Sequence, residues 1–186
     1  MKRLLDFILA TILLLIFLIP MIVISIILLV SSGLPILYWS DRVGKNNKIF
    51  KMPKFRSMIE QTPEVATHLL TESDQYIIPF GVFLRKTSLD EIPQILSVIK
   101  GDMSFVGPRP ALFNQYDLIK MRMERGIDKL LPGITGWAQI NGRDELLIIK
   151  KVELDEEYLN KQSFWFDIKI LIITLVAVVK LKGVNS

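Results

Sequence analysis

One uncharged run, Phe7 to Ser40, constrains the fold of this chain more than any other feature. It has 34 residues, of which 26 are apolar. As one straight helix the run would be roughly 51 Å long, against a bilayer hydrocarbon core of roughly 30 Å. Lys2 and Arg3 precede it as in a signal peptide, but an apolar core of about 7 to 15 residues is typical there. We therefore expect a retained membrane segment that must tilt, bend or fold back.

Pro20 lies inside the run and should kink it, because proline lacks an N–H and clashes with the carbonyl one turn earlier. The kink leaves two arms, 7–19 and 21–32, and neither is long enough to span a bilayer. Basic residues flank both ends of the run, which favours the cytoplasmic face for both. On hydropathy alone, a re-entrant helical hairpin and a single tilted, kinked span both remain open. Basic residues that follow the run are Arg42, Lys45, Lys48, Lys51, Lys54 and Arg56.

The rest of the chain, 41–186, has an ordinary globular composition, with 65 apolar residues among 146. We therefore expect two parts, a membrane-anchoring segment 1–40 and a cytoplasmic domain 41–186, and exclude a polytopic transporter. With no cysteine and one histidine, the chain cannot form a disulfide scaffold, a thiolate zinc site or a multi-histidine metal site. Its net charge of +4 suits anionic ligands. Because the basic segment 48–58 adjoins the membrane run, lipid headgroups and phosphorylated ligands are favoured over nucleic acid.

The patterns after residue 40 predict a small α+β domain, mostly helical, with short β-hairpin elements. Segment 48–58 interleaves basic with aromatic or apolar residues, as an exposed hairpin would. Segment 88–101 is typical of a helix stopped by Gly101, and a longer helix is expected from about 145 to 159. Turns at 131–133 and 141–143 leave 135–140 as a short strand or loop. Near the C-terminus, apolar residues at helical spacing lie between Trp165 and the basic pair Lys180 and Lys182. That segment is either an amphipathic helix in the membrane interface or a core helix.

Asp90 and Glu91 are the sharpest chemical feature. At the start of a helix the positive end of the helix dipole would keep Asp90 ionised. A structural reading competes with a catalytic one, since Ser88 and Glu91 fit the S-x-x-E capping box. Arg85 lies five residues upstream, and Arg109 stands between two prolines that hold its backbone extended. Arginine suits phosphate oxygens, and a carboxylate near bound phosphate is a usual ligand of Mg²⁺.

Three motifs follow one another along the chain, and their order is specific enough to point to one protein family. They are KIFKMPKFRSM at 48–58, SLDEIPQILSVIKGDMSFVGPRPAL at 88–112 and LPGITGWAQINGR at 131–143. With the N-terminal apolar run, they resemble the bacterial sugar transferase family, that is, the monotopic phosphoglycosyl transferases of PglC type in their minimal form. The resemblance covers about residues 1 to 182. It also favours the re-entrant hairpin over the spanning helix.

The resemblance implies an enzyme of the bacterial inner membrane, with its catalytic domain facing the cytoplasm. It implies transfer of a sugar 1-phosphate from a UDP-sugar to undecaprenyl phosphate, with release of UMP, as the first membrane step of glycoconjugate biosynthesis. By matching position, Asp90 would be the nucleophile that forms an aspartyl-phosphosugar intermediate, and Glu91 would assist. Both carboxylates would hold Mg²⁺. Phosphate-binding residues implied by matching motifs are Arg85, Arg109, Lys54, Arg56 and Arg143.

Several points are left open by the sequence. In the family the proline of the hairpin usually follows a serine, whereas here Ile19 precedes Pro20, so the capping of the break differs. A non-enzymatic, membrane-anchored module that binds anionic lipid is the alternative function, with Asp90 and Glu91 as helix caps. The sequence names neither the sugar nor the pathway, and it leaves a homodimer open.

Overall fold

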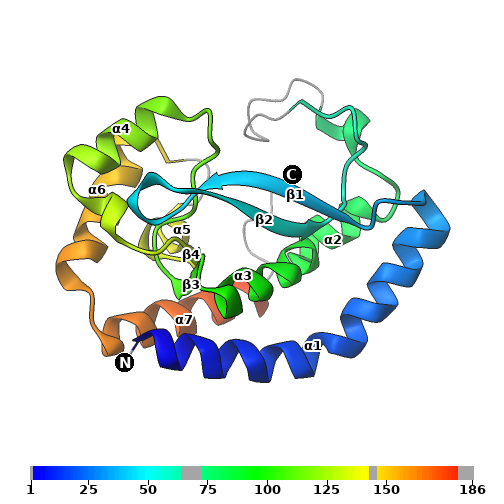
Figure 1. Ribbon diagram of the computed structural model, residues 1–186, viewed down its shortest axis with the longest axis horizontal. Coiled ribbons are helices and arrows are strands. Elements are labelled where there is room, and N and C mark those ends of the chain that lie inside the picture. Colours follow the sequence, from blue (N-terminus) through cyan, green and yellow to red (C-terminus); the bar gives the residue numbers. More distant parts are fainter. Residues whose placement is uncertain (1, 64–72, 143–145, 180–186) are drawn as a thin grey trace.

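The computed structural model describes residues 2–63, 73–142 and 146–179. A long N-terminal helix lies along one side, and a two-stranded hairpin with the remaining helices lies above it (Figure 1). The prediction of a mostly helical α+β fold with a short hairpin is confirmed. In chain order the elements are α1 (Lys2–Ser32), β1 (Leu37–Val43), η1 (Lys45–Asn47), β2 (Ile49–Phe55), η3 (Ser73–Tyr76), α2 (Gly81–Thr87), η4 (Leu89–Gln94), α3 (Ile95–Lys100), β3 (Ser104–Val106), α4 (Tyr116–Glu124), η5 (Ile127–Lys129), β4 (Gly133–Thr135), α5 (Trp137–Ile140), α6 (Ile148–Lys161) and α7 (Phe164–Val179).

Helix α1 has the length and composition needed to cross a membrane. It continues through Pro20 as one helix rather than as two separate arms, and Figure 1 shows it bending partway along its length. Of the nearby hydroxyls, that of Ser25 donates to the carbonyl of Met21 at 2.7 Å. The helix ends as expected at Ser32, followed by Gly33 with φ +67°. Apolar side chains cover most of its exposed surface, which is the pattern of a lipid-facing helix.

The structure has two pairs of strands, of which the sequence predicted one in part and the other not at all. The sequence predicted a hairpin within 48–58, but the structure makes only one strand there, β2, which pairs antiparallel with β1 so that Leu37 lies opposite Phe55 and Val43 opposite Ile49. β1 thus takes in residues 37–40, the end of the uncharged run. β3 and β4 form a parallel pair that was not predicted, with Ser104 opposite Gly133. The expectation of a strand or loop at 135–140 was wrong, because α5 makes a short helix of Trp137–Ile140 there. Pairing between β3 and β4 is non-local and leaves no local period in the sequence.

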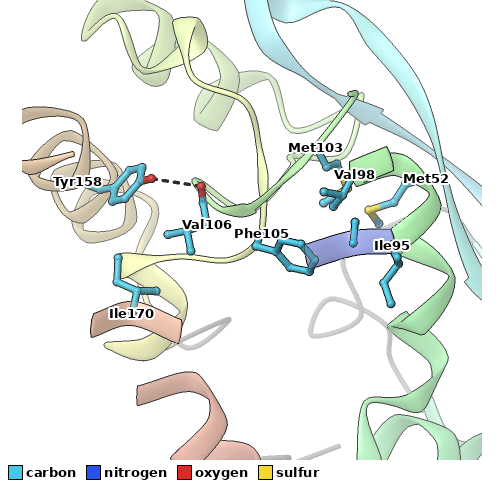
Figure 2. Close-up of a cluster of buried hydrophobic side chains, with 9 residues drawn as sticks. Met52, Ile95, Val98, Met103, Phe105, Val106, Tyr158 and Ile170 are labelled. Atoms are coloured by element: carbon cyan, nitrogen blue, oxygen red, sulfur yellow. Dashed lines mark hydrogen bonds between the residues drawn. The ribbon is translucent and has the colours of Figure 1, made fainter. Parts of the chain in front are cut away.

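The main hydrophobic core lies where α1, α3, β3, α6 and α7 meet. Figure 2 shows Phe105 and Val106 of β3 between side chains of α3 and those of α6 and α7. Ala10 of α1 is part of this core, and Leu28 near the other end of α1 packs in a second one with Phe55 and Leu84. The apolar helix therefore packs on the rest of the fold along both of its halves.

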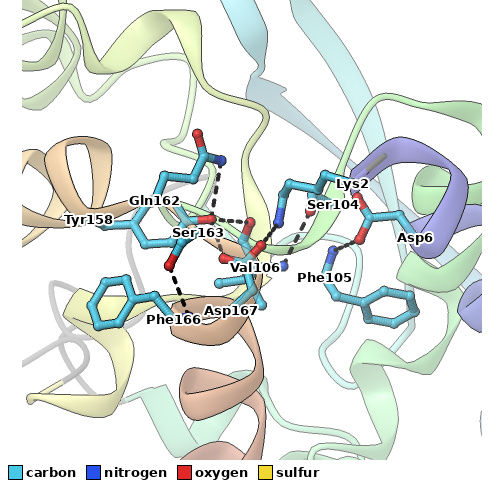
Figure 3. A network of polar contacts seen from close by, with 10 residues as sticks. All are labelled: Lys2, Asp6, Ser104, Phe105, Val106, Tyr158, Gln162, Ser163, Phe166 and Asp167. Carbon is cyan, nitrogen blue, oxygen red and sulfur yellow. Dashed lines mark hydrogen bonds and ion pairs between the residues drawn. The ribbon is translucent and has the colours of Figure 1, made fainter.

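Polar contacts fix the first turns of α1 (Figure 3). Lys2 forms an ion pair with Asp167 of α7, and the Tyr158 hydroxyl lies 2.7 Å from Oδ1 of the same carboxylate. Asp6 is buried and accepts a hydrogen bond from the backbone N–H of Phe105 at 3.3 Å. Arg3 donates to the carbonyls of Val98 and Ile99 at the end of α3.

Helix α7 carries an exposed apolar face that begins in its first turn, as the amphipathic interpretation predicted. Trp165 is 77% exposed, and Ile172, Leu175 and Val176 are also exposed, whereas Ile170 is buried. The core-helix alternative holds for the opposite face, where Ile170 is part of the main core, but not for the exposed positions. Lys180 and Lys182 lie outside the described residues. The helix expected at about 145–159 is α6, which runs from Ile148 to Lys161.

Candidate active site

Asp90 and Glu91 lie in the 3₁₀ segment η4, between α2 and α3. The sequence predicted one helix over 88–101, but regular α-helix begins only at Ile95, because Pro93 removes an N–H from this stretch. Ser88 takes a left-handed conformation, with φ +57°, and its side chain makes no capping hydrogen bond. The capping-box interpretation was therefore wrong, and Glu91 has other partners.

Glu91 is held by two cations from distant parts of the chain. Nζ of Lys54, on β2, lies 2.7 Å from Oε1 of Glu91, and Nη2 of Arg109 lies 3.1 Å from the same oxygen. Burial by itself would raise the pKa of Glu91. The charges and hydrogen bonds of Lys54 and Arg109 outweigh burial and lower that pKa well below its usual range. Glu91 is therefore ionised throughout the physiological pH range.

The pKa of Asp90 shifts in the opposite direction, upward. Its residue is only 9% exposed, and this burial raises its pKa to about 6. The charge of Lys54 opposes the shift, the charge of Glu91 adds to it, and Arg85 and Arg109 oppose it. Two adjacent carboxylates whose environments move their pKa values apart are typical of catalytic pairs. The arrangement offers one permanently charged acid and one that titrates near neutral pH.

Of the five predicted phosphate-binding residues, three lie near the two acids, one lies apart from them, and one is outside the described residues. Lys54 and Arg109 contact Glu91 directly, and Arg85 acts on Asp90 through its charge while its Nη1 lies 3.1 Å from Sδ of Met58. Arg56 lies apart: it is buried and donates to the carbonyls of Ser32, Gly33 and Leu34 at the end of α1. That placement favours a structural role as a cap of α1. Arg143 lies outside the described residues.

Close backbone contact holds the segment that carries Arg109 against β4. The N–H of Gly107 donates to the carbonyl of Thr135, and the N–H of Gly133 donates to the carbonyl of Pro108, both at 2.9 Å. A Cβ on Gly133 would lie 2.2 Å from the backbone nitrogen of Gly107. Only glycine fits such a contact, so the glycines of the VGPRP and LPGITG motifs place Arg109 relative to the acids.

The two predicted Mg²⁺ ligands, Asp90 and Glu91, do not belong to a larger cluster of possible metal ligands among the described residues. Within 2–63, 73–142 and 146–179, no group of three or more His, Cys, Asp or Glu side chains is placed to hold a metal ion. Asp90 and Glu91 alone suit the usual mode of Mg²⁺, which keeps several waters and binds through one or two carboxylates together with substrate phosphates. Asp90 and Glu91 are therefore the residues that could hold Mg²⁺ here, with other ligands completing its coordination shell.

Sequence reasoning missed one buried ion pair next to this site, between Arg122 of α4 and Asp155 of α6. A signal was present in α6, where Asp155 lies three residues from both Val152 and Tyr158. These spacings put the acid on the buried face of the helix. An acid among apolar residues of one helix face needs a partner, and this one finds it on α4.

Comparison with known proteins agrees with the geometry. The chain is 43% identical over 185 residues to the UDP-glucose:undecaprenyl-phosphate glucose-1-phosphate transferase of Escherichia coli K12, covering 94% of this chain and 39% of the relative. It is 39% identical over 154 residues to the uncharacterized sugar transferase EpsL of Bacillus subtilis, covering 83% of this chain and 75% of that protein. An undecaprenyl-phosphate galactose phosphotransferase of Salmonella typhimurium is 36% identical over 170 residues, covering 82% of this chain and 35% of its own length.

The chain thus spans about two fifths of the Escherichia coli relative and a larger share of the one from Bacillus subtilis. A sequence profile of the bacterial sugar transferases matches residues 1–181, which is nearly the whole chain. The stretch that matches includes the acids, the cations around them and α1. This chain belongs to the bacterial sugar transferase family.

Proposed function

We propose that the chain is a phosphoglycosyl transferase that moves a sugar 1-phosphate from a UDP-sugar to undecaprenyl phosphate and releases UMP. One observation carries the proposal: a buried Asp90, whose pKa is raised to about 6, stands beside an ionised Glu91 that Lys54 and Arg109 hold. Relatives whose names specify transfer of glucose 1-phosphate or galactose phosphate with undecaprenyl phosphate support the same reaction. These names make glucose and galactose the first sugars to test with this chain.

In the first step a carboxylate oxygen of Asp90 attacks the β-phosphorus of the UDP-sugar. The new O–P bond forms as the bond from that phosphorus to the bridging oxygen breaks, and UMP leaves with the bridging oxygen. In the second step a phosphate oxygen of undecaprenyl phosphate attacks the same phosphorus. The bond to Asp90 then breaks, which regenerates the carboxylate and gives undecaprenyl diphosphate sugar. A covalent intermediate lets a soluble donor and a lipid acceptor use one site in turn.

The cations around the acids suit this chemistry. A carboxylate that approaches a diphosphate is repelled unless positive charge is fixed nearby, and Lys54, Arg85 and Arg109 provide it. Arg109 offers a planar fork of donors, of which Nη2 already bonds Glu91. We assign Glu91 to hold Lys54 and Arg109 in place. With Asp90 it would hold Mg²⁺, which when bound neutralises charge on the diphosphate oxygens.

We also propose that α1 enters and leaves the membrane on its cytoplasmic face, so that the site lies at the headgroup plane of the bacterial inner membrane. The first turns of α1 are bonded to α3, β3 and α7 through Arg3, Asp6 and Lys2. The carbonyl of Ser32, its last residue, accepts a hydrogen bond from Arg56, next to the hairpin. Both ends therefore contact one folded unit, which suits a re-entrant helix. Residues 1–40 would anchor 41–186, and the apolar face of α7 would lie in the interface.

Cysteine labelling tests this topology, since the chain has no cysteine of its own. We expect cysteines introduced at Lys2 and Lys45 to react with a membrane-impermeant maleimide only after the inner membrane is permeabilised. Pro20→Ala should shift a fraction of molecules to a spanning state, because it restores the backbone bond that the proline lacks. Labelling of residue 2 from the periplasm in the chain with Pro20 would contradict the proposal.

The pH dependence of the first step should report Asp90. Only the ionised carboxylate attacks, and its pKa is raised to about 6. Below that pH the rate of adduct formation at low UDP-sugar should fall by about tenfold per pH unit, whereas above pH 7 it should be flat. Glu91→Gln should move this acid limb to lower pH, because the charge of Glu91 raises the pKa of Asp90. A flat rate between pH 8 and pH 5 would contradict the assignment.

Arg109→Lys should impair turnover although it keeps the charge. Lysine replaces a planar fork with a single ammonium, so one of the charge-assisted bonds is lost. Such a bond contributes about 1.5–3 kcal/mol, which corresponds to a fall in kcat/KM of roughly 10- to 100-fold. The measurement is steady-state UMP release in membranes with saturating Mg²⁺. Wild-type turnover would show that only the charge of Arg109 is used.

Release of UMP on incubation with a UDP-sugar and undecaprenyl phosphate tests the function itself. UDP-glucose and UDP-galactose are the first donors to compare, and release should require the lipid phosphate for multiple turnovers. The alternative of a lipid-binding module predicts no nucleotide release with any donor. That alternative is disfavoured by η4, where Glu91 contacts Lys54 and Arg109 instead of capping a helix.

A further inference from the structure

The backbone around Arg109 is fixed at every carbonyl from residue 108 to residue 111. Two prolines in this stretch cannot donate hydrogen bonds, so its position depends on what its carbonyls accept. The four donors come from three separate parts of the chain, namely β1, α4 and β4. They are Gly133 N–H to Pro108 at 2.9 Å, Arg122 Nη1 to Arg109 at 2.8 Å, Arg42 Nη1 to Pro110 at 3.3 Å and Val43 N–H to Ala111 at 2.9 Å.

Arg122 donates to the carbonyl of Arg109 itself, and the rest of its guanidinium group is bonded to Asp155. Its Nε and Nη2 lie 3.0 and 2.6 Å from Oδ2 of Asp155, which leaves Nη1 directed at the carbonyl of Arg109. Arg122 is 8% exposed and Asp155 is 1% exposed. A buried ion pair contributes little net stability compared with a well-packed apolar pair, because both charges lose their hydration. Stability alone is therefore a poor explanation for this pair.

We propose that Arg122, oriented by Asp155, is a positioning residue for the reaction: it fixes the backbone of Arg109 so that the Arg109 fork meets Glu91 and the substrate phosphates. This inference rests on the proposed function, in which Arg109 binds phosphate. The chain of contacts runs from Asp155 on α6, through Arg122 on α4, to the backbone of Arg109 and on to Glu91 in η4. Helices outside the immediate site thus set the geometry of its cation.

The same two helices supply a matched control. Arg125, which follows the last residue of α4, forms an ion pair with Glu156 of α6 at 2.6 Å, and both side chains are partly exposed. This pair also links α4 to α6, but within the described part of the chain its hydrogen bonds and ion pairs do not reach the 107–112 segment. If the ion pairs only hold the helices together, the two arginines should behave alike on substitution. If Arg122 positions Arg109, they should differ.

Arg122→Lys and Arg125→Lys are the variants to compare in the full-length chain. Lysine at 122 keeps the charge next to Asp155, but one ammonium cannot reproduce the fork that also reaches the Arg109 carbonyl. We expect kcat/KM for UMP release to fall by roughly 10- to 100-fold in Arg122→Lys and to change by less than about twofold in Arg125→Lys. Adding Arg122→Lys to Arg109→Lys should lower activity by no more than about twofold further, because both changes disturb one contact.

Hydrogen–deuterium exchange of the peptide 107–115 gives a readout that does not depend on activity. Arg122→Lys should accelerate exchange there by roughly tenfold relative to wild type, and Arg125→Lys should leave it unchanged. If Arg122→Lys does not fold, Asp155→Asn replaces it, with acceleration in the same peptide expected. Equal exchange and equal turnover for the two arginine variants would overturn the inference while leaving the proposed function intact. Absence of UMP release by wild type would instead refute the proposed function, and the exchange comparison would still decide the role of Arg122.

Discussion

Replacing Asp90 by asparagine is expected to abolish sugar-phosphate transfer, with a loss of turnover on the order of 10⁴-fold or more. An amide of the same size cannot form the O–P bond that the proposed first step requires. The change should not lower thermal stability, because a neutral side chain avoids the cost of burying an ionised carboxylate whose pKa is raised. Turnover and exchange of labelled UMP into UDP-sugar, measured with an unfolding curve, check both expectations.

Two companion variants make the result specific to Asp90. Asp117→Asn changes an exposed acid in the first turn of α4 and should leave turnover at the wild-type level. Glu91→Gln should slow the reaction without abolishing it, since Glu91 holds cations rather than attacking phosphorus. If Asp90→Asn keeps substantial UMP exchange, Asp90 is not the nucleophile, even though the family assignment stands.

Replacing Gly133 by alanine should have the second largest effect, on stability as well as activity. A Cβ there would lie 2.2 Å from N of Gly107, 2.4 Å from O of Thr135 and 2.7 Å from O of Gly107. These are backbone atoms, which cannot rotate away, so β3 and β4 must separate. We expect a loss of about 3 kcal/mol, or a Tm lower by roughly 10 °C. Displacement of the Arg109 segment should also lower kcat/KM by about 100-fold.

Gly126→Ala is the control for this change. Gly126 has φ +70° but open space around its Cβ position, so alanine meets only the cost of a left-handed backbone, about 1 kcal/mol. Thermal unfolding and steady-state UMP release of both variants give the comparison. Similar Tm values for the two alanines would mean that the close approach of Gly133 to Gly107 is not what holds these strands together.

Local patterns predicted the elements that a local signal specifies. Hydropathy identified α1, alternation identified β2, and Gly101 marked the end of α3, where the residue has φ +101°. The pairing of β3 with β4 was not predictable in this way, because it joins segments about thirty residues apart through backbone bonds. The helix α5 was missed since it is a short turn between glycine-rich loops.

The sequence predicted most residues of the site, but it did not predict which of them contact one another. Asp90, Glu91 and Arg109 stand in recognisable motifs, but the contact between Lys54 and Glu91 joins a strand to a 3₁₀ segment and depends on the tertiary fold. Lys54 and Arg56 look alike in the sequence and would share a face of one strand. Because β2 ends at Phe55, Arg56 leaves that face and caps α1 instead. Arg122 carried no local signal at all.

The most direct test of the central claim is a search for the covalent intermediate. Wild type incubated with UDP-sugar and Mg²⁺, without lipid acceptor, should accumulate a sugar-phosphate adduct on the tryptic peptide 87–100. Fragmentation should place the adduct on Asp90 rather than Glu91, and undecaprenyl phosphate should remove it. An adduct on another carboxylate, such as Asp102, Asp155 or Asp167, would contradict the account, as would full turnover with no UMP exchange in the absence of acceptor.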